Sequence, residues 1–153
     1  MKKFSFTIII FLISAGSFCS CSKKGNSEPM EIPFTEYSLV GTLCQWTNFD
    51  YADKVIVING NEDLGKYIDC TDGGYYPGID FSRHTLLLAC GGTTNGVREI
   101  NTDFSKNALN KYILSIMVHL NISMVAQGWH ISILVPKISD EAIIILDVIQ
   151  THY

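Results

Sequence analysis

The residues of this chain best suited to chemistry are three cysteines that follow its first 40 residues, Cys44, Cys70 and Cys90. Cysteines of an exported protein readily form disulfides. Cys90 ends the apolar run Thr85–Cys90, so we predict that it is a free thiol packed in the core. Cys44 and Cys70 lie in polar, turn-rich stretches, and we predict a disulfide between them, although spacing alone does not fix the connectivity.

An alternative role for Cys44 is that of a nucleophile. The sequence of residues 41–46, Gly-Thr-Leu-Cys-Gln-Trp, is similar to the cysteine motif of papain-like proteases, except that Gln45 separates the cysteine from the tryptophan. The chain is too short for the second half of that fold, and the histidines available as bases have no local signature. A small hydrolase is therefore the least favoured alternative, and we expect no enzyme activity.

The four histidines of the chain are scattered, at His84, His119, His130 and His152. No two of them have the close spacing of a zinc motif. His119 and His130 would meet if the strands that carry them were neighbours, because both point away from the apolar face. We favour a surface pair without a metal, and we predict neither a metal nor a cofactor.

Aromatic side chains gather in segments that have the composition of loops. Among them are Trp46, Tyr75 and Tyr76. Exposed aromatic residues suit the binding of a glycan or of a protein. The alternative, which we favour, is that they cover the open ends of a β-sheet core. We keep these three residues as a possible ligand or partner surface.

The elements that must position these residues are mostly strands. The apolar runs 54–59 and 85–90 predict two strands, and the alternating patterns of 111–122, 129–136 and 142–152 predict three more. We expect the last three to form an antiparallel meander. A short helix should begin near Asn61, which can cap it, and should carry Leu64, Tyr67 and Ile68 on one face. The predicted fold is mainly β (α+β), an antiparallel sheet or sandwich-like domain with one or two short helices.

The beginning of the chain has the anatomy of a secretory signal. Lys2 and Lys3 precede the apolar run Phe4–Ile13, which is followed by small residues. The run is shorter than the roughly 20 residues of a transmembrane helix. Cys21 follows Ser20, as the cysteine of a bacterial lipoprotein signal follows a small residue, whereas Cys19 follows the bulky Phe18. We therefore predict lipidation at Cys21; the alternative is a cleaved signal without lipid.

This signal divides the chain into three parts. Residues 1–20 are the predicted signal peptide, residues 21–35 an acylated cysteine with a flexible, proline-containing tether, and residues 36–153 a single β-rich domain. Removing the signal peptide takes away two of the 11 basic residues and none of the 15 acidic ones, which leaves a formal charge of −6. An acidic domain without a basic stripe argues against binding to nucleic acid or to an anionic lipid surface.

Three stretches carry a resemblance to known proteins: Gly78–Gly92 with its Ile-Asp-Phe-Ser turn and apolar strand, Lys54–Ile68 before it, and Cys44-Gln45-Trp46. Gly78–Gly92 and Lys54–Ile68 are similar to the C-terminal domain of protease-complex-stabilising lipoproteins. Cys44-Gln45-Trp46, together with Trp129 and the segment Val135–Lys137, resembles small lipoproteins of the Bacteroidota. The resemblance covers roughly residues 38–150 and implies a non-enzymatic, β-rich interaction domain.

The leading functional hypothesis is a lipid-anchored module of the cell envelope that binds or stabilises an envelope protein. A glycan-binding accessory lipoprotein that uses Trp46, Tyr75 and Tyr76 is the first alternative, and the small hydrolase is the second. Lys23 and Lys24 stand where surface-exported lipoproteins of the Bacteroidota carry an acidic signal. We therefore expect the domain to face the periplasm. Of the two membranes, we expect the outer one rather than the inner one.

Overall fold

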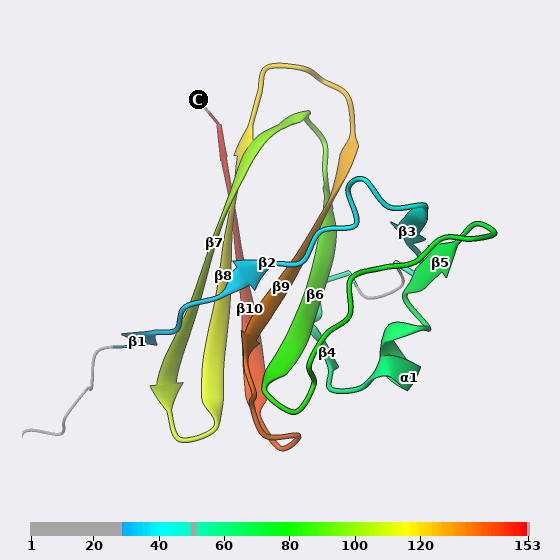
Figure 1. Cartoon of the computed structure of the whole chain (residues 1–153). Helices are drawn as coiled ribbons and strands as arrows, with labels where there is room; N and C mark the ends of the chain where they lie inside the picture. Colours follow the sequence, from blue (N-terminus) through cyan, green and yellow to red (C-terminus); the bar gives the residue numbers. More distant parts are fainter. Residues whose placement is uncertain (1–28, 50–51, 153) are drawn as a thin grey trace, which may run out of the picture.

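The computed structural model describes residues 29–49 and 52–152, in which two four-stranded sheets pack face to face (Figure 1). The first sheet contains, in spatial order, β1 (Met30–Glu31), β7 (Val97–Ala108), β8 (Lys111–Leu120) and β10 (Ile143–His152). The second contains β2 (Thr35–Glu36), β9 (Gln127–Pro136), β6 (His84–Thr93) and β4 (Ile56–Ile58). The predicted mainly β, sandwich-like fold is confirmed.

A flank of shorter elements covers the outer side of the second sheet (Figure 1). It consists of the two-stranded sheet of β3 (Cys44–Trp46) and β5 (Ile68–Cys70) together with the helix α1 (Asn61–Leu64). The helix is shorter than predicted: Gly60 is its N-cap, not Asn61, and Ile68 already belongs to β5. Gly65 ends the helix after one turn, and only Leu64 of its four residues is buried.

The second sheet is buried on both faces, which explains the uninterrupted apolar run of β6. Leu87 and Ala89 face the first core, which lies between the two sheets and includes Phe104 and Leu114. The alternate residues of β6, Leu86, Leu88 and Cys90, face the second core, which lies between the second sheet and the flank. The thiol of Cys90 is buried in the second core, as predicted.

The predicted antiparallel meander of the last three strands is wrong. β8 lies in the first sheet, β9 in the second, and β10 in the first again. Because the chain crosses between the sheets twice, β10 runs parallel to β8, from Ile143 opposite Lys111 to His152 opposite Leu120. The alternation of β8 specified its buried face correctly, since Leu114, Ile116 and Val118 point into the first core. Alternation identifies a strand's buried face but not its neighbour.

Because the chain crosses between the sheets after β8, it also separates His119 from His130, for which a contact was considered. His119 lies on β8, where its Nδ1 atom is 3.0 Å from the hydroxyl of Thr151 on the neighbouring β10. His130 lies on β9 in the other sheet, opposite Cys90 of β6. The possible pairing of His119 with His130 is therefore wrong.

In the structure, the β-rich domain begins before residue 36, the first residue of the predicted domain. Met30 of β1 is opposite Lys106 of β7, and Thr35 of β2 is opposite Leu134 of β9, so this segment passes from the first sheet to the second. Part of the predicted tether is thus two short edge strands of the sandwich. The predicted signal peptide and Cys21 lie outside the described residues. No helix in residues 29–49 and 52–152 is long and apolar enough to cross a membrane.

Candidate functional site

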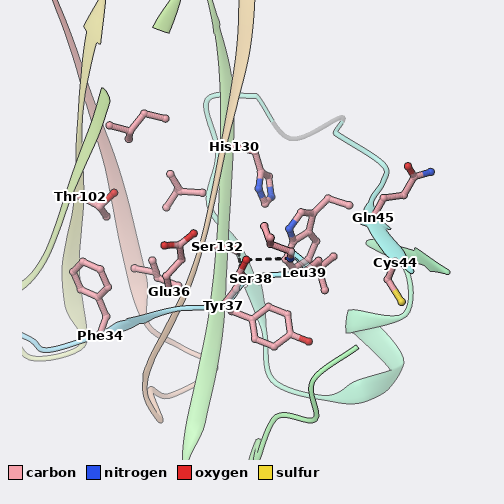
Figure 2. A pocket seen from close by; sticks show the side chains of 15 residues that line it. Phe34, Glu36, Tyr37, Ser38, Leu39, Cys44, Gln45, Thr102, His130 and Ser132 are labelled. Atoms are coloured by element: carbon pink, nitrogen blue, oxygen red, sulfur yellow. Dashed lines mark hydrogen bonds between the residues drawn. The ribbon is translucent and has the colours of Figure 1, made fainter. Parts of the chain in front are cut away.

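A groove of about 680 Å³ opens at the edge of the sandwich where β2 ends (Figure 2). Both sheets contribute to it, the first through Ile100 and Thr102 of β7 and the second through residues 130–133 of β9. Phe34 and Glu36 form its near end, and Gln45 and Trp46 of the flank form one wall. All three layers of the domain therefore meet at this groove.

The groove exists because the edge strands are too short to cover the sandwich edge. β1 pairs only with Ser105 and Lys106 of β7, and β2 pairs only with Ile133 and Leu134 of β9. After a last hydrogen bond, from the Tyr37 N–H to the Ser132 carbonyl at 2.9 Å, the chain turns away over the second sheet. Within the described residues, no strand accompanies the remainder of β9 on this side.

Aromatic rings form the wall of the groove on the flank side. The ring of Trp46 lies 5.9 Å from that of Tyr37, at an edge-to-face angle, and 5.0 Å from the imidazole of His130. The Tyr37 hydroxyl donates a 2.6 Å hydrogen bond to the carbonyl of Pro77. Burial, with a smaller contribution from Tyr76, raises the pKa of Tyr37 to about 12, so its phenol stays protonated at neutral pH.

The disulfide between Cys44 and Cys70 holds this aromatic wall in place, and its prediction is confirmed. The two cysteines are direct partners in the β3–β5 pair, with Cα atoms 4.0 Å apart. Trp46 belongs to the same strand as Cys44, opposite Ile68. The disulfide also removes the thiol that the alternative of a Cys44 nucleophile requires.

Polar groups mark the two sides of the groove. Figure 2 shows Glu36 and Thr102 on one side of β9 and His130 and Gln45 on the other. The Ser132 hydroxyl donates a 2.6 Å hydrogen bond to the Tyr37 carbonyl. Among the described residues that line the groove, Glu36 is the only one with a formal charge at pH 7, since burial lowers the pKa of His130 to about 4.

The depressed pKa of His130 predicts a loss of stability in mild acid. The imidazole stays neutral in the fold down to about pH 4, whereas in the unfolded chain it binds a proton below its ordinary pKa of 6.5. The stability that it contributes is therefore complete above pH 6.5 and is lost as the pH falls toward 4. We expect this loss of stability to be about 1–2 kcal/mol. It is smaller than the full pKa shift would give, because water reaches part of the ring.

Urea unfolding at pH 7 and pH 4.5, with His130→Gln as the control, measures this effect. The glutamine variant cannot take up the proton, so its stability should fall less over the same interval. Equal losses in the two proteins would mean that other groups, such as the carboxylates, cause the whole pH dependence.

Comparison with known proteins leaves the family open. No protein-family model matches the chain, and neither the curated proteins nor the solved structures contain a match. The resemblance to lipoproteins of the Bacteroidota therefore stays a prediction, and the site is interpreted from its own geometry.

The three aromatic residues predicted as a binding surface lie in different surroundings. Trp46 lines the groove. Tyr76 packs against the second core, whereas Tyr75 is 81% exposed and is not part of the groove lining. Glu36 and Tyr37 were not predicted as groove residues, because both lie at the boundary between the predicted tether and the predicted domain.

His130 and Ser132 are further groove residues, which the alternation of β9 placed on a solvent-facing side. The flank covers that side of the strand, and Ser132 is 6% exposed. Across residues 29–49 and 52–152, no group of three or more histidine, cysteine, aspartate or glutamate side chains is arranged to hold a metal ion. What the groove offers is an aromatic wall, a carboxylate and a strand edge, which are elements of binding.

Proposed function

We propose that this chain is a lipid-anchored module of the cell envelope that binds a segment of a partner protein in the groove beside β9. The observation that carries the proposal is the position of the groove, at an edge where, within the described residues, the part of β9 before Ser132 has no neighbouring strand on one side and lies beside an aromatic wall. Protein segments commonly bind to such edges by adding a strand, because main-chain hydrogen bonds then supply affinity.

Glycan binding is the second candidate, and Trp46 is the observation in its favour. Sugars stack on open aromatic faces, and Trp46 is the only member of the predicted aromatic surface that lines the groove. Its ring is already in contact with the rings of Tyr37 and His130. A platform of several aromatic faces is thus not formed by Trp46, Tyr75 and Tyr76, and we favour the protein partner.

The groove proposal is tested with a photo-crosslinking amino acid in place of Gln45 or Thr102, in the envelope of cells that make this protein. The control position is Thr94, which is exposed and does not line the groove. We expect both groove positions, but not Thr94, to give one adduct of the same mass. Adducts of equal yield from all three positions, or none from the groove, would contradict the proposal.

The anchor has its own test, metabolic labelling with an alkyne fatty acid. We expect Cys21→Ser to abolish the label, because the thiol of Cys21 would carry the first acyl chain, and Cys19→Ser to retain it. Loss of the label in Cys19→Ser alone would move the anchor to that residue. An unlabelled wild-type chain would remove the anchor from the proposed function.

A further inference from the structure

We propose that the groove receives an extended peptide of alternating pattern, which pairs with the edge of β9 and directs a lysine or arginine side chain toward Glu36. This inference rests on the proposed function, since it names the chemistry of the partner segment. Three observations carry it: the geometry of the strand edge, the difference between the two sides of the groove, and its charge.

The strand edge has a definite length. The Tyr37 N–H bonds to the Ser132 carbonyl, and backbone groups of alternate residues point to the same edge of a strand, so those of His130 and Gly128 share this direction. At the other end, the side chain of Gln127 accepts a 2.8 Å hydrogen bond from the Val97 N–H and links the two sheets. Because the Ser132 carbonyl is already bonded to Tyr37, the open interval runs from Gly128 to Ile131 and is about 10 Å long, which suits a segment of three or four residues.

The two sides of this edge differ in chemistry. Odd-numbered residues of β9, such as Ile131, point toward the first core, where Glu36 and Thr102 line the groove. The even-numbered His130 faces the aromatic wall with Trp46. Side chains of a bound strand would alternate between these sides. Residues on one side would lie against the rings, and residues on the other would lie against Ile100 and Ile131, where Glu36 supplies the charged group.

The negative charge of Glu36 favours a cationic peptide side chain on the side of the groove that Glu36 lines. Glu36 is exposed, and within the described residues its carboxylate has neither a salt bridge nor a hydrogen bond. No lysine or arginine lines the groove in the described part of the chain. A basic side chain would therefore meet an uncompensated carboxylate, and the formal charge of −6 of the chain after residue 20 would steer a basic segment toward the domain.

The inference is tested with four capped pentapeptides, Thr-Val-X-Val-Thr, in which X is lysine, arginine, glutamine or glutamate. Their affinities for the purified lipoprotein in a non-ionic detergent are measured by calorimetry or NMR titration. We expect the lysine and arginine peptides to bind about three- to fivefold more tightly than the glutamine peptide, the range of an exposed charge pair. The glutamate peptide should bind most weakly, and 0.5 M salt should reduce the differences.

Matched variants of the protein test whether the preference for lysine and arginine peptides arises in the groove. Glu36→Gln should make the lysine and glutamine peptides equal, and Glu36→Lys should reverse the order in favour of glutamate. Glu99→Gln on β7 removes an exposed carboxylate that does not line the groove, so it should change nothing. Methylation of the peptide amides that face β9 should abolish binding, because a strand addition depends on them.

Each contrary result has a definite meaning. A preference that survives Glu36→Gln, equal affinities for all four peptides, or no binding up to millimolar concentration would overturn this inference. The proposed function would still stand if the crosslinks from Gln45 and Thr102 persist. Binding of chitotetraose that is lost in Trp46→Ala, with no peptide binding, would overturn the inference and favour the glycan candidate.

Discussion

Replacing Gly91 by alanine should lower the free energy of unfolding by about 2–3 kcal/mol, the cost of forcing an extra methyl group into a packed core. Gly91 of β6 lies directly opposite Trp129 of β9. A Cβ atom at position 91 would lie 2.5 Å from Cζ2 and 2.7 Å from Cε2 of the indole. These distances are far inside van der Waals contact.

The indole of Trp129 has little room to move away. It is 6% exposed and belongs to the first core. A rigid double ring cannot bend locally, so the added methyl group must turn the whole side chain or separate β6 from β9. Both responses disturb the central strand pair of the second sheet.

The neighbouring Gly92 supplies the control for this substitution. A Cβ atom at position 92 would have no atom within 4 Å, so Gly92→Ala should change the stability by less than about 0.5 kcal/mol. Urea unfolding followed by circular dichroism compares the two variants. The double variant Gly91→Ala with Trp129→Phe should be less destabilised than the sum of its single changes, since the smaller ring yields space. Equal stabilities of the Gly91 and Gly92 variants would show that the indole can be displaced without cost.

The sequence predicts the class of the fold well because burial leaves a local pattern. The alternation of β8 and the continuous apolar run of β6 both follow from which faces are covered. The neighbours of a strand leave no such pattern. The crossing of the chain between sheets, which places β10 parallel to β8, depends on packing between residues far apart in sequence.

The candidate site could be predicted only in part for the same reason. Cys44 and Cys70 were paired correctly from their polar surroundings. Trp46 was singled out by its residue type, but that criterion also selected Tyr75, which lies away from the groove. Glu36 and His130 have no distinguishing local signal. Glu36 lines the groove because β2 ends there, and His130 lines it because the flank covers β9.

Removal of the Cys44–Cys70 disulfide should lower the stability of the domain by about 3 kcal/mol. The disulfide joins residues 26 positions apart, and closing a loop of that size restricts the unfolded chain by about this amount. Within the fold, the loop between the two cysteines contributes Ile58 and Leu64 to the second core. The flank and the second sheet share this core, so loss of the disulfide should weaken both.

The effect should be strongest at the groove. The strand β3 has three residues, and its partner β5 also has three, so this pair has few hydrogen bonds of its own. Without the disulfide, amide hydrogen exchange should accelerate in residues 43–47 and 68–71 more than in β6 or β9. Trp46 would then lose its fixed position against Tyr37, and groove binding should weaken along with the stability.

The measurement combines thermal unfolding and hydrogen exchange of the wild-type chain, with and without reductant, and of the double variant Cys44→Ser with Cys70→Ser. Reductant should destabilise the wild type to the level of the variant and should leave the variant unchanged, because the described residues contain no second disulfide. Unchanged stability and exchange of the wild type after full reduction would show that packing of the second core alone holds the flank. In that case the aromatic wall would not depend on the redox state of the compartment.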